Sequence, residues 1–564
     1  MQNETEGCRS YLVTLFAVLV AGCGSGADDS SSTPAAVVPP QDTSFLLAPG
    51  GTRNWLTAAE LTAAQFPENS AFHNDWFMPI GSASPAQHVF GGTLRISSRA
   101  LAGNGPDMLD GRQLKLLPDV PLQFISHEGR LVPLTGVPQY ANDNSYWGIM
   151  LSPGRVWHEG DDGTWSRASF PFALVHRTRN EVHNGIATFL FDGVSVSRLR
   201  LQVVQETAAW ARYDLWAHVP MTYTAEQFAN DTAVRDAFDA GLATRLPVAS
   251  WAELEQLHGG MLPGFDAGVT QTDISVSGIV HAGTIYLQGC RSRYGDFPYC
   301  EDMRHGAFSV TKSSIAAVTL LRLAQKYGPS VLDERIDSHL NVTASHDGWN
   351  GVTFRDALSM TTGIGDLEPF PSGDVFADEN QAKMEQFSQQ LATAAKLQLA
   401  FSYGDYPWSP GSVVRYNSTH TFVLGAAMQA FLRGREGPSA TLAGLLRDEV
   451  FAVIGLQNVP LMETFEPGNA QGVPLMFVGF YPTVDELGRI AMLLQQLGEW
   501  QGEQVLHREL TATALYRRAE NGLPADYLSN GNGTSRYLLS FWSSPQVETS
   551  GCRVEVPVRS GFGG

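Results

Sequence analysis

A serine and a lysine stand three residues apart where an apolar, helix-forming segment of the chain begins. They are Ser309 and Lys312, and the apolar segment continues to Ala324. On a helix this spacing places both side chains on one face, a turn apart, so the amine can reach the hydroxyl oxygen. A serine hydroxyl needs a neighbouring base to attack a carbonyl, and lysine is a base only where burial or a nearby cation favours its neutral form. The pair therefore predicts a nucleophilic serine in a partly desolvated cleft.

The same two residues also have a simpler interpretation. A serine at a helix N-terminus is more often a cap, and a lysine one turn later is usually solvated. The chain contains five lysines, so chance would supply about 0.4 Ser-x-x-Lys matches at ordinary serine usage. The motif by itself leaves both interpretations open, and the rest of the sequence has to decide between them.

Length and composition limit the class of protein. The chain has 564 residues, of which 43% are hydrophobic and 17% charged, the balance of a globular protein of about two to four domains. The formal net charge is −20 at pH 7 and no stretch is densely basic, so nucleic acid is not an expected partner. The histidines form no His-Glu-x-x-His pattern and the cysteines no Cys-x-x-Cys pair, so the sequence predicts neither a metal nor a cofactor.

The N-terminus carries an apolar stretch, Tyr11 to Gly22, that is too short to span a bilayer but suits the core of a signal peptide. It runs into Val20-Ala21-Gly22-Cys23, which resembles the lipobox of bacterial lipoproteins, although the leading segment is less positive than such signals usually are. The resemblance implies a signal peptide over residues 1–22, a lipid anchor on Cys23 and a flexible linker over residues 23–43. Because Gly24 and not Asp follows the cysteine, it also implies the periplasmic face of the outer membrane. An ordinary secretory signal, giving a periplasmic or secreted protein, stays open.

Export would place the remaining cysteines in an oxidising compartment. Cys290 and Cys300 bracket a short loop just before Ser309, and we predict that they form a disulfide worth about 2 to 3 kcal/mol. Cys552 is then the odd one out. The alternative is three free, buried thiols.

Residues 44–264 are predicted to form a separate β-rich domain. Short alternating segments such as 194–204 and 185–191 indicate strands of a β-sandwich or β-barrel, with helices near 225–244 and 250–258. The region resembles no family known to us, so the sequence leaves its role undefined. Exposed tryptophans would suit carbohydrate stacking, although such residues are more often core; the candidates are Trp147, Trp157, Trp165 and Trp210.

From residue 265 to the end, an α+β pattern begins with a predicted hairpin over 274–289. Four stretches in this half, taken in order, resemble the serine β-lactamase-like hydrolases, which include class C β-lactamases, penicillin-binding DD-peptidases, esterases and 6-aminohexanoate-dimer hydrolase. Ser309 to Lys312 resembles the family's Ser-x-x-Lys, and residues 352–363 resemble its Thr-x-Arg-Asp segment. Pro410-Gly411 leading to Tyr416 resembles the stretch with the catalytic tyrosine, and Arg559-Ser560-Gly561 stands where the family has Lys-Thr-Gly. The implied fold is an antiparallel sheet flanked by helices.

The resemblance also implies roles for individual residues. Tyr416 would relay the proton between nucleophile and leaving group. The backbone N–H groups of Ser309 and Phe562 would form the oxyanion hole, and Arg559, Ser560 and Gly561 would line the substrate strand. The family continues past its Gly-x-Gly-Gly stretch with further strands and a helix, so the sequence is expected to be truncated after Gly564.

Two departures from the family pattern bear on the substrate. Asn417 and Ser418 follow the tyrosine, whereas the β-lactamases and peptidases place asparagine two residues after it. Arg559 replaces lysine; it still binds carboxylates but is not a tunable point charge. Both departures favour a small-molecule ester or amide over a β-lactam or a D-Ala-D-Ala peptide.

Three functions follow from the sequence. The first is a serine hydrolase that forms an acyl-enzyme on Ser309. The second is a DD-peptidase or β-lactamase, and the third is a non-catalytic, glycan-binding surface lipoprotein in which the C-terminal half is only scaffold.

Overall fold

The structure is a computed structural model. It describes residues 19–21 and 56–561, with gaps at 82, 109–112, 209, 260–261, 263–264, 266–268, 270–273, 366–374, 380, 519 and 548–552. The predicted lipidation site Cys23, the predicted linker, Cys552 and Phe562 lie outside the described residues. Of the predicted signal peptide, only the short strand β1 (Leu19–Ala21) is described. No helix in the described part of the chain is long and apolar enough to cross a membrane.

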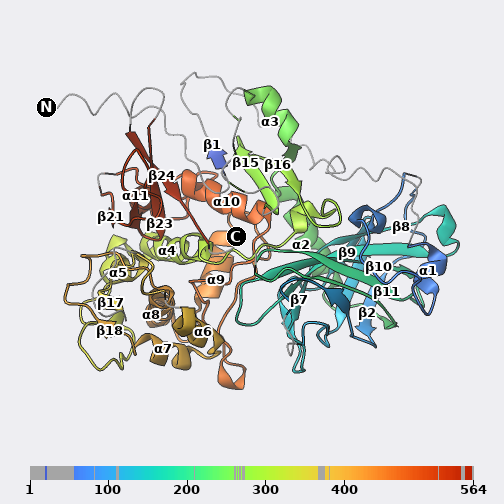
Figure 1. The fold of residues 1–564 in the computed structure, drawn as a ribbon, viewed down its shortest axis with the longest axis horizontal. Helices are drawn as coiled ribbons and strands as arrows, with labels where there is room; N and C mark the ends of the chain where they lie inside the picture. The colour runs from blue at the N-terminus through green and yellow to red at the C-terminus, as the bar shows by residue number, and fades with distance from the viewer. Residues whose placement is uncertain are drawn as a thin grey trace.

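Twelve antiparallel strands of the first half form one sheet on one side of the molecule (Figure 1). They are β2 (Gly91–Ile96), β3 (Ala102–Asn104), β4 (Leu122–His127), β5 (Arg130–Pro133), β6 (Gln139–Tyr140), β7 (Gly148–Leu151), β8 (Gly154–Trp157), β9 (Ser166–Val175), β10 (Val182–Phe191), β11 (Leu199–Glu206), β12 (Asp214–Val219) and β13 (Met221–Ala225). The main path runs β13-β2-β4-β5-β8-β9-β10-β11-β12-β3, with β7 beside β9 and β6 beside β7.

The central strands of this sheet are buried on both faces. All ten residues of β10 are buried, and successive side chains of a strand point to opposite faces. Phe189 and Phe191 pack into a core formed by the sheet itself. Ile186 and Leu190 pack into a second core that also contains the helices of the C-terminal half. The two halves of the chain therefore share a hydrophobic core.

Two predicted element boundaries in this half were wrong. The helix predicted near residues 225–244 begins only at residue 231, as α2 (Asp231–Thr244), and residues 221–225 form β13, which pairs with β2. The strand expected from residue 194 begins at Leu199. The Asp192 carboxylate accepts the backbone N–H of Ser195 at 2.7 Å, so the turn before this strand extends further than predicted.

Two of the four tryptophans considered for carbohydrate stacking are core residues. Trp147 is 2% exposed and Trp157 is 4% exposed, so neither can stack on a sugar. Trp165 is partly buried and packs against the shared core. Trp210 is 40% exposed, with its ring 5.5 Å from that of Phe308, the residue before Ser309.

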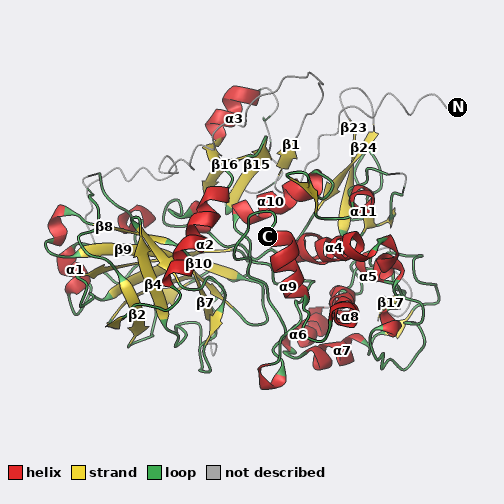
Figure 2. Ribbon diagram, turned by 180° about the vertical axis from the view of Figure 1, so that it is seen from behind, coloured by secondary structure: helices red, strands yellow, loops and turns green. Residues whose placement is uncertain are grey.

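The C-terminal half combines helices with small sheets, and its helices from residue 317 onward lie together beside the large sheet (Figure 2). The helices after α2 are α3 (Trp251–His258), α4 (Ala317–Tyr327), α5 (Phe354–Leu358), α6 (Gln381–Gln389), α7 (Thr393–Ala400), α8 (Ser418–Glu436), α9 (Leu442–Leu446), α10 (Val484–Gln495) and α11 (Arg508–Ala514). The strands are β14 (Val248–Ser250), β15 (Val276–His281), β16 (Thr284–Cys290), β17 (Ile364–Gly365), β18 (Gly404–Asp405), β19 (Glu499–Trp500), β20 (Glu503–Gln504), β21 (Leu523–Pro524), β22 (Arg536–Leu538), β23 (Phe541–Val547) and β24 (Arg553–Val558). The predicted fold class, a β-rich region followed by an α+β half, is confirmed.

The hairpin β15–β16 leads into the segment that carries Ser309. Its turn falls at Ala282 and Gly283, both with positive φ, as the sequence predicts. Cys290, at the end of β16, forms a disulfide with Cys300, with the two Cα atoms 5.4 Å apart. The segment that follows the disulfide contacts the large sheet before the helix of Lys312 begins, since Asn184 and Thr207 accept the backbone N–H groups of Arg304 and Gly306.

Candidate active site

The segment before Ser309 is held by side chains of the β-rich half. Asn180 Oδ1 accepts the backbone N–H of Phe308 at 2.8 Å and that of Gly479 at 2.8 Å. A Cβ at Gly306 would lie 1.8 Å from the Asn180 carbonyl oxygen, so only glycine allows this close approach. Phe308 has φ of 42°, an uncommon conformation for a non-glycine residue. The turn that presents Ser309 is therefore fixed from both halves of the chain.

Lys312 lies at the centre of the site. The helix begins at Val310 and is wound as a π-helix over Lys312–Ala316 before continuing as α4. Lys312 Nζ lies 2.8 Å from Ser309 Oγ, 2.9 Å from Ser418 Oγ and 3.1 Å from the Phe477 carbonyl oxygen. A neutral amine has two N–H bonds and one lone pair. Donation to Ser418 and Phe477 therefore leaves the lone pair for the Ser309 hydroxyl proton.

The surroundings of Lys312 favour its neutral form. The side chain is 1% exposed, and burial lowers its pKa to about 8, against the opposing effect of the Glu379 carboxylate. Because this pKa lies near neutral pH, the amine can lose its proton there, as a general base requires. Ser309 itself is partly exposed, so a substrate can reach the nucleophile while Lys312, its base, stays buried.

Tyr416 lies beside the same amine. Lys312 Nζ is 4.8 Å from the centre of its ring. Burial, with further contributions from Tyr537 and Glu379, raises the pKa of the phenol well above its ordinary value, while a hydrogen bond with Ser309 lowers it. The protonated phenol is the stable form, so Tyr416 is placed to donate a proton and not to act as a phenolate.

Asn417 and Ser418 have different roles. Asn417 caps α8, where its Oδ1 accepts the backbone N–H of Thr419 at 3.0 Å. Ser418 faces Lys312 and also contacts Glu379, whose carboxylate accepts the Ser418 backbone N–H at 2.7 Å and its hydroxyl proton. The position where part of the family has asparagine is thus occupied by a hydroxyl between an amine and a carboxylate.

The chain just beyond β24 lies against Ser309. A Cβ on Gly561 would lie 3.3 Å from Ser309 N and 2.6 Å from the Ala307 carbonyl oxygen, so the chain can come this close here only as glycine. Ser560 Oγ lies 3.0 Å from Tyr527 Oη. Arg559 is 3% exposed and donates to Ser314 Oγ at 2.8 Å, and burial lowers its pKa to about 10. The other predicted oxyanion donor, Phe562, lies outside the described residues.

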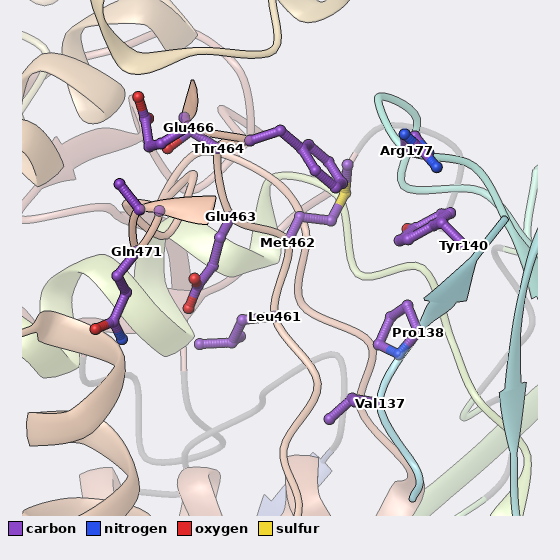
Figure 3. A pocket seen from close by; sticks show the side chains of 13 residues that line it. Val137, Pro138, Tyr140, Arg177, Leu461, Met462, Glu463, Thr464, Glu466 and Gln471 are labelled. Carbon is purple, nitrogen blue, oxygen red and sulfur yellow. The ribbon is translucent and has the colours of Figure 1, made fainter. Parts of the chain in front are cut away.

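A separate cavity of about 510 Å³ lies between the two halves (Figure 3). The β-rich half contributes Tyr140 and Arg177, and the C-terminal half contributes residues 461–466. The Arg177 guanidinium lies over the rings of Tyr140 and Phe465, at 5.0 and 5.3 Å. None of the predicted catalytic residues lines this cavity.

One group among the described residues has the composition of a metal site. His127, Glu128 and Asp239 bring three potential ligand atoms within 4.8 Å of one another. His127 Nε2 already bonds the Asp239 carboxylate at 2.9 Å, and Arg235 lies 3.4 Å from its other nitrogen. Among the residues that the structure describes, no contact links this group to Ser309, and the chemistry of the serine site needs no metal.

The sequence did not reveal two residues that the structure brings to the site. Glu379 belongs to a polar stretch without periodicity, and Asn180 lies in the β-rich half, where the sequence suggested no resemblance to a family. The sequence offered a signal for Glu379 only. The acidic pair Asp378 and Glu379 precedes Tyr416 by fewer than forty residues.

A buried amine at a serine hydroxyl, a phenol beside both and a glycine next to the serine N–H are the arrangement that a serine hydrolase needs. Residues 265–531 match the family model described as Beta-lactamase. Over these residues the chain therefore matches the β-lactamase family of serine hydrolases and has its fold.

Solved structures of this fold are similar to the chain at low sequence identity. A putative 6-aminohexanoate-dimer hydrolase from Bacillus anthracis is 14% identical, with a TM-score of 0.34, over 50% of this chain and 72% of its own. A D-stereospecific amidohydrolase from Streptomyces sp. is 14% identical, with a TM-score of 0.32, over 45% of this chain and 74% of its own. A penicillin-binding protein homologue from Caulobacter crescentus is 16% identical, with a TM-score of 0.30, over 48% of this chain and 83% of its own. No curated protein matches the chain.

Proposed function

We propose that the protein is an exported serine hydrolase that cleaves a small ester or amide through an acyl-enzyme on Ser309. The observation that supports this most directly is the contact of 2.8 Å between Lys312 Nζ and Ser309 Oγ, with the amine buried and the hydroxyl accessible. A cap serine and a solvated lysine would show neither feature.

The reaction follows from the positions of the groups. Lys312 takes the proton of Ser309 as its oxygen attacks the substrate carbonyl. The Ser309 N–H, for which no acceptor is found among the described residues, faces the oxygen that becomes negative. Tyr416 gives a proton to the departing alcohol or amine and regains one from Lys312. Water then enters by the reverse path and releases the acid.

Export and lipid anchoring on Cys23 are part of the proposal. The disulfide between Cys290 and Cys300 supports export, because such bonds persist in oxidising compartments. An ester or amide is favoured over a β-lactam because Ser418 replaces the asparagine of the β-lactamases and because the Arg559 guanidinium is buried against Ser314.

Intact-protein mass spectrometry after exposure to a fluorophosphonate, and separately to a penicillin, tests this proposal. We expect one fluorophosphonate adduct, mapped to Ser309 and absent from Ser309→Ala, which should keep the wild-type free energy of unfolding within about 1 kcal/mol. Ser402→Ala, at an exposed serine far along the chain, serves as the matched control and should label normally. A stable penicillin adduct would indicate a DD-peptidase, and rapid penicillin turnover a β-lactamase. No adduct from either probe on folded protein would favour the non-catalytic alternative.

A further inference from the structure

We propose that Ser418 and Glu379 extend the Ser309–Lys312 pair into a proton relay, in which Glu379 is a positioning residue that acts on Lys312 through the Ser418 hydroxyl. The inference rests on the proposed function, because a relay has meaning only if Ser309 is a nucleophile.

The contacts form an unbroken chain with consistent donors. Nζ of Lys312 lies 2.8 Å from Ser309 Oγ and 2.9 Å from Ser418 Oγ, and the Ser418 hydroxyl donates to Glu379. A hydroxyl that accepts from the amine has its own proton free to give, so each link has one donor and one acceptor. No residue in this chain has to change orientation before a proton moves.

Glu379 could instead serve only to cap α8. One of its oxygens accepts the Ser418 backbone N–H at 2.7 Å in the first turn of this helix. Asn417 already caps this helix, and capping by Glu379 requires only one carboxylate oxygen. The other oxygen accepts the hydroxyl proton of Ser418, a side chain that faces Lys312. A cap alone does not explain that choice.

The relay answers an electrostatic problem in the proposed reaction. When Lys312 takes the proton from Ser309, a positive charge appears in a site that is closed to water, where an uncompensated charge is costly. Among the described residues, the titratable groups that face Lys312 are the ring of Tyr416, which is neutral when the ammonium forms, and Glu379. Asp378, next to Glu379, is engaged by Arg415 at 3.0 Å and by Tyr406 at 2.7 Å. Glu379 is therefore the anion available to the new ammonium.

The protons balance at every step. As the Ser309 oxygen bonds to the carbonyl carbon, its proton moves to Lys312, a proton of Lys312 moves to Ser418, and the Ser418 proton moves to Glu379. When the bond to the leaving group breaks, the proton returns from Glu379 by the same groups to Lys312, which restores the proton that Tyr416 has given up. Hydrolysis of the acyl-enzyme repeats the sequence with water as the proton source, and no other reactant is needed.

The test measures the second-order rate of fluorophosphonate labelling of the full chain against pH, since this probe needs no knowledge of the substrate. Wild type should show a rise in rate centred at about pH 8, where Lys312 loses its proton. In Glu379→Gln the carboxylate that holds the ammonium is gone, so we expect the rise to move to lower pH and the plateau rate to fall about 10-fold to 100-fold. If the plateau rate falls but the pH at which the rate rises does not change, the relay is overturned and Glu379 is only a helix cap.

Further variants sharpen the result. Ser418→Ala breaks the link, and because Glu379 acts through it, the double variant should lose no more rate than the slower single variant; additive losses would overturn the proposal. Glu463→Gln removes a half-buried carboxylate that makes no contact with Lys312 and should leave the profile unchanged.

If Glu379→Gln does not fold, Glu379→Asp keeps the charge but withdraws it by one methylene. It should lower the plateau, and an unchanged plateau would count against the relay.

The proposed function and the relay fail in different ways. Without labelling of Ser309 in wild type, the proposed function fails before the variants are compared. With normal wild-type labelling and a pH profile that Glu379→Gln does not move, only the relay fails.

Discussion

Replacing Asn180 by alanine should disturb the nucleophile from the other half of the chain. The Asn180 side chain accepts from the N–H groups of Phe308 and Gly479 at 2.8 Å each, and donates to the Phe480 carbonyl oxygen at 3.3 Å. The residue is 2% exposed. Alanine would leave two buried N–H groups without an acceptor, one of them in the residue before Ser309.

The size of the effect follows from these contacts. An unsatisfied buried donor costs about 1 to 3 kcal/mol, so two of them would cost about 2 to 6 kcal/mol. A water molecule in the space left by the side chain would offset part of this, and we expect a loss of about 2 to 4 kcal/mol in the free energy of unfolding. Phe308 has a positive φ, and the hydrogen bond from its N–H to Asn180 supports this conformation. Without that bond Ser309 would be misplaced, and its labelling by the fluorophosphonate should slow at least about tenfold.

Urea denaturation and the labelling rate, measured on the same preparations, check both numbers. Asn230→Ala is the matched control, because Asn230 is exposed and makes no side-chain cap bond at α2; neither quantity should change. If Asn180→Ala unfolds at the wild-type midpoint and labels at the wild-type rate, the argument that the β-rich half positions the nucleophile is refuted. A loss of stability with a normal labelling rate would confine Asn180 to packing.

Two other residues give tests outside the active site. Lys396 is buried among aromatic rings, and burial lowers its pKa to about 7. In the unfolded chain a lysine has a pKa of about 10.4. The buried ammonium therefore destabilises the folded state by its full amount below about pH 7, and this destabilisation disappears as the pH rises to about 10.4. Lys396→Met should therefore raise the free energy of unfolding, measured by urea denaturation, by roughly 2 to 4 kcal/mol at pH 7 and have little effect at pH 10. An equal effect at both pH values would contradict this. Cys290→Ser should lower stability by about 2 to 3 kcal/mol. Dithiothreitol should lower the free energy of unfolding of the wild-type protein by the same amount and leave that of the variant unchanged. If dithiothreitol also destabilises the variant, the Cys290–Cys300 disulfide is not the cause.

The part of the site that depends on local geometry was predictable from the sequence. Ser309 and Lys312 are neighbours because a helix brings residues three apart together, and this holds whatever surrounds it. The disulfide joins two cysteines only ten positions apart. Tyr416 lies far along the chain, and only the resemblance of its flanking residues to a family indicated that it belongs beside Lys312.

Contacts between distant parts of the chain were not predictable in this way. Glu379 meets Ser418 across 39 positions, and Asn180 meets Gly479 across 299. A single sequence carries no period or spacing that records such pairs. The errors at β13 and β11 have a related origin, because pairing with a neighbouring strand and a longer turn overrode the local pattern.

The contacts around Ser309 also bear on why the β-rich half is present. Phe308 belongs to the hydrophobic core of the large sheet, and Thr207 and Asn184 bond the backbone of Gly306 and Arg304 at 3.2 and 3.1 Å. Each of these bonds satisfies a buried polar group of the segment that enters the nucleophile turn, and without the sheet those groups would have no partner among the described residues. A sugar-binding role is therefore not needed to account for this half, since the geometry of the proposed nucleophile already depends on it.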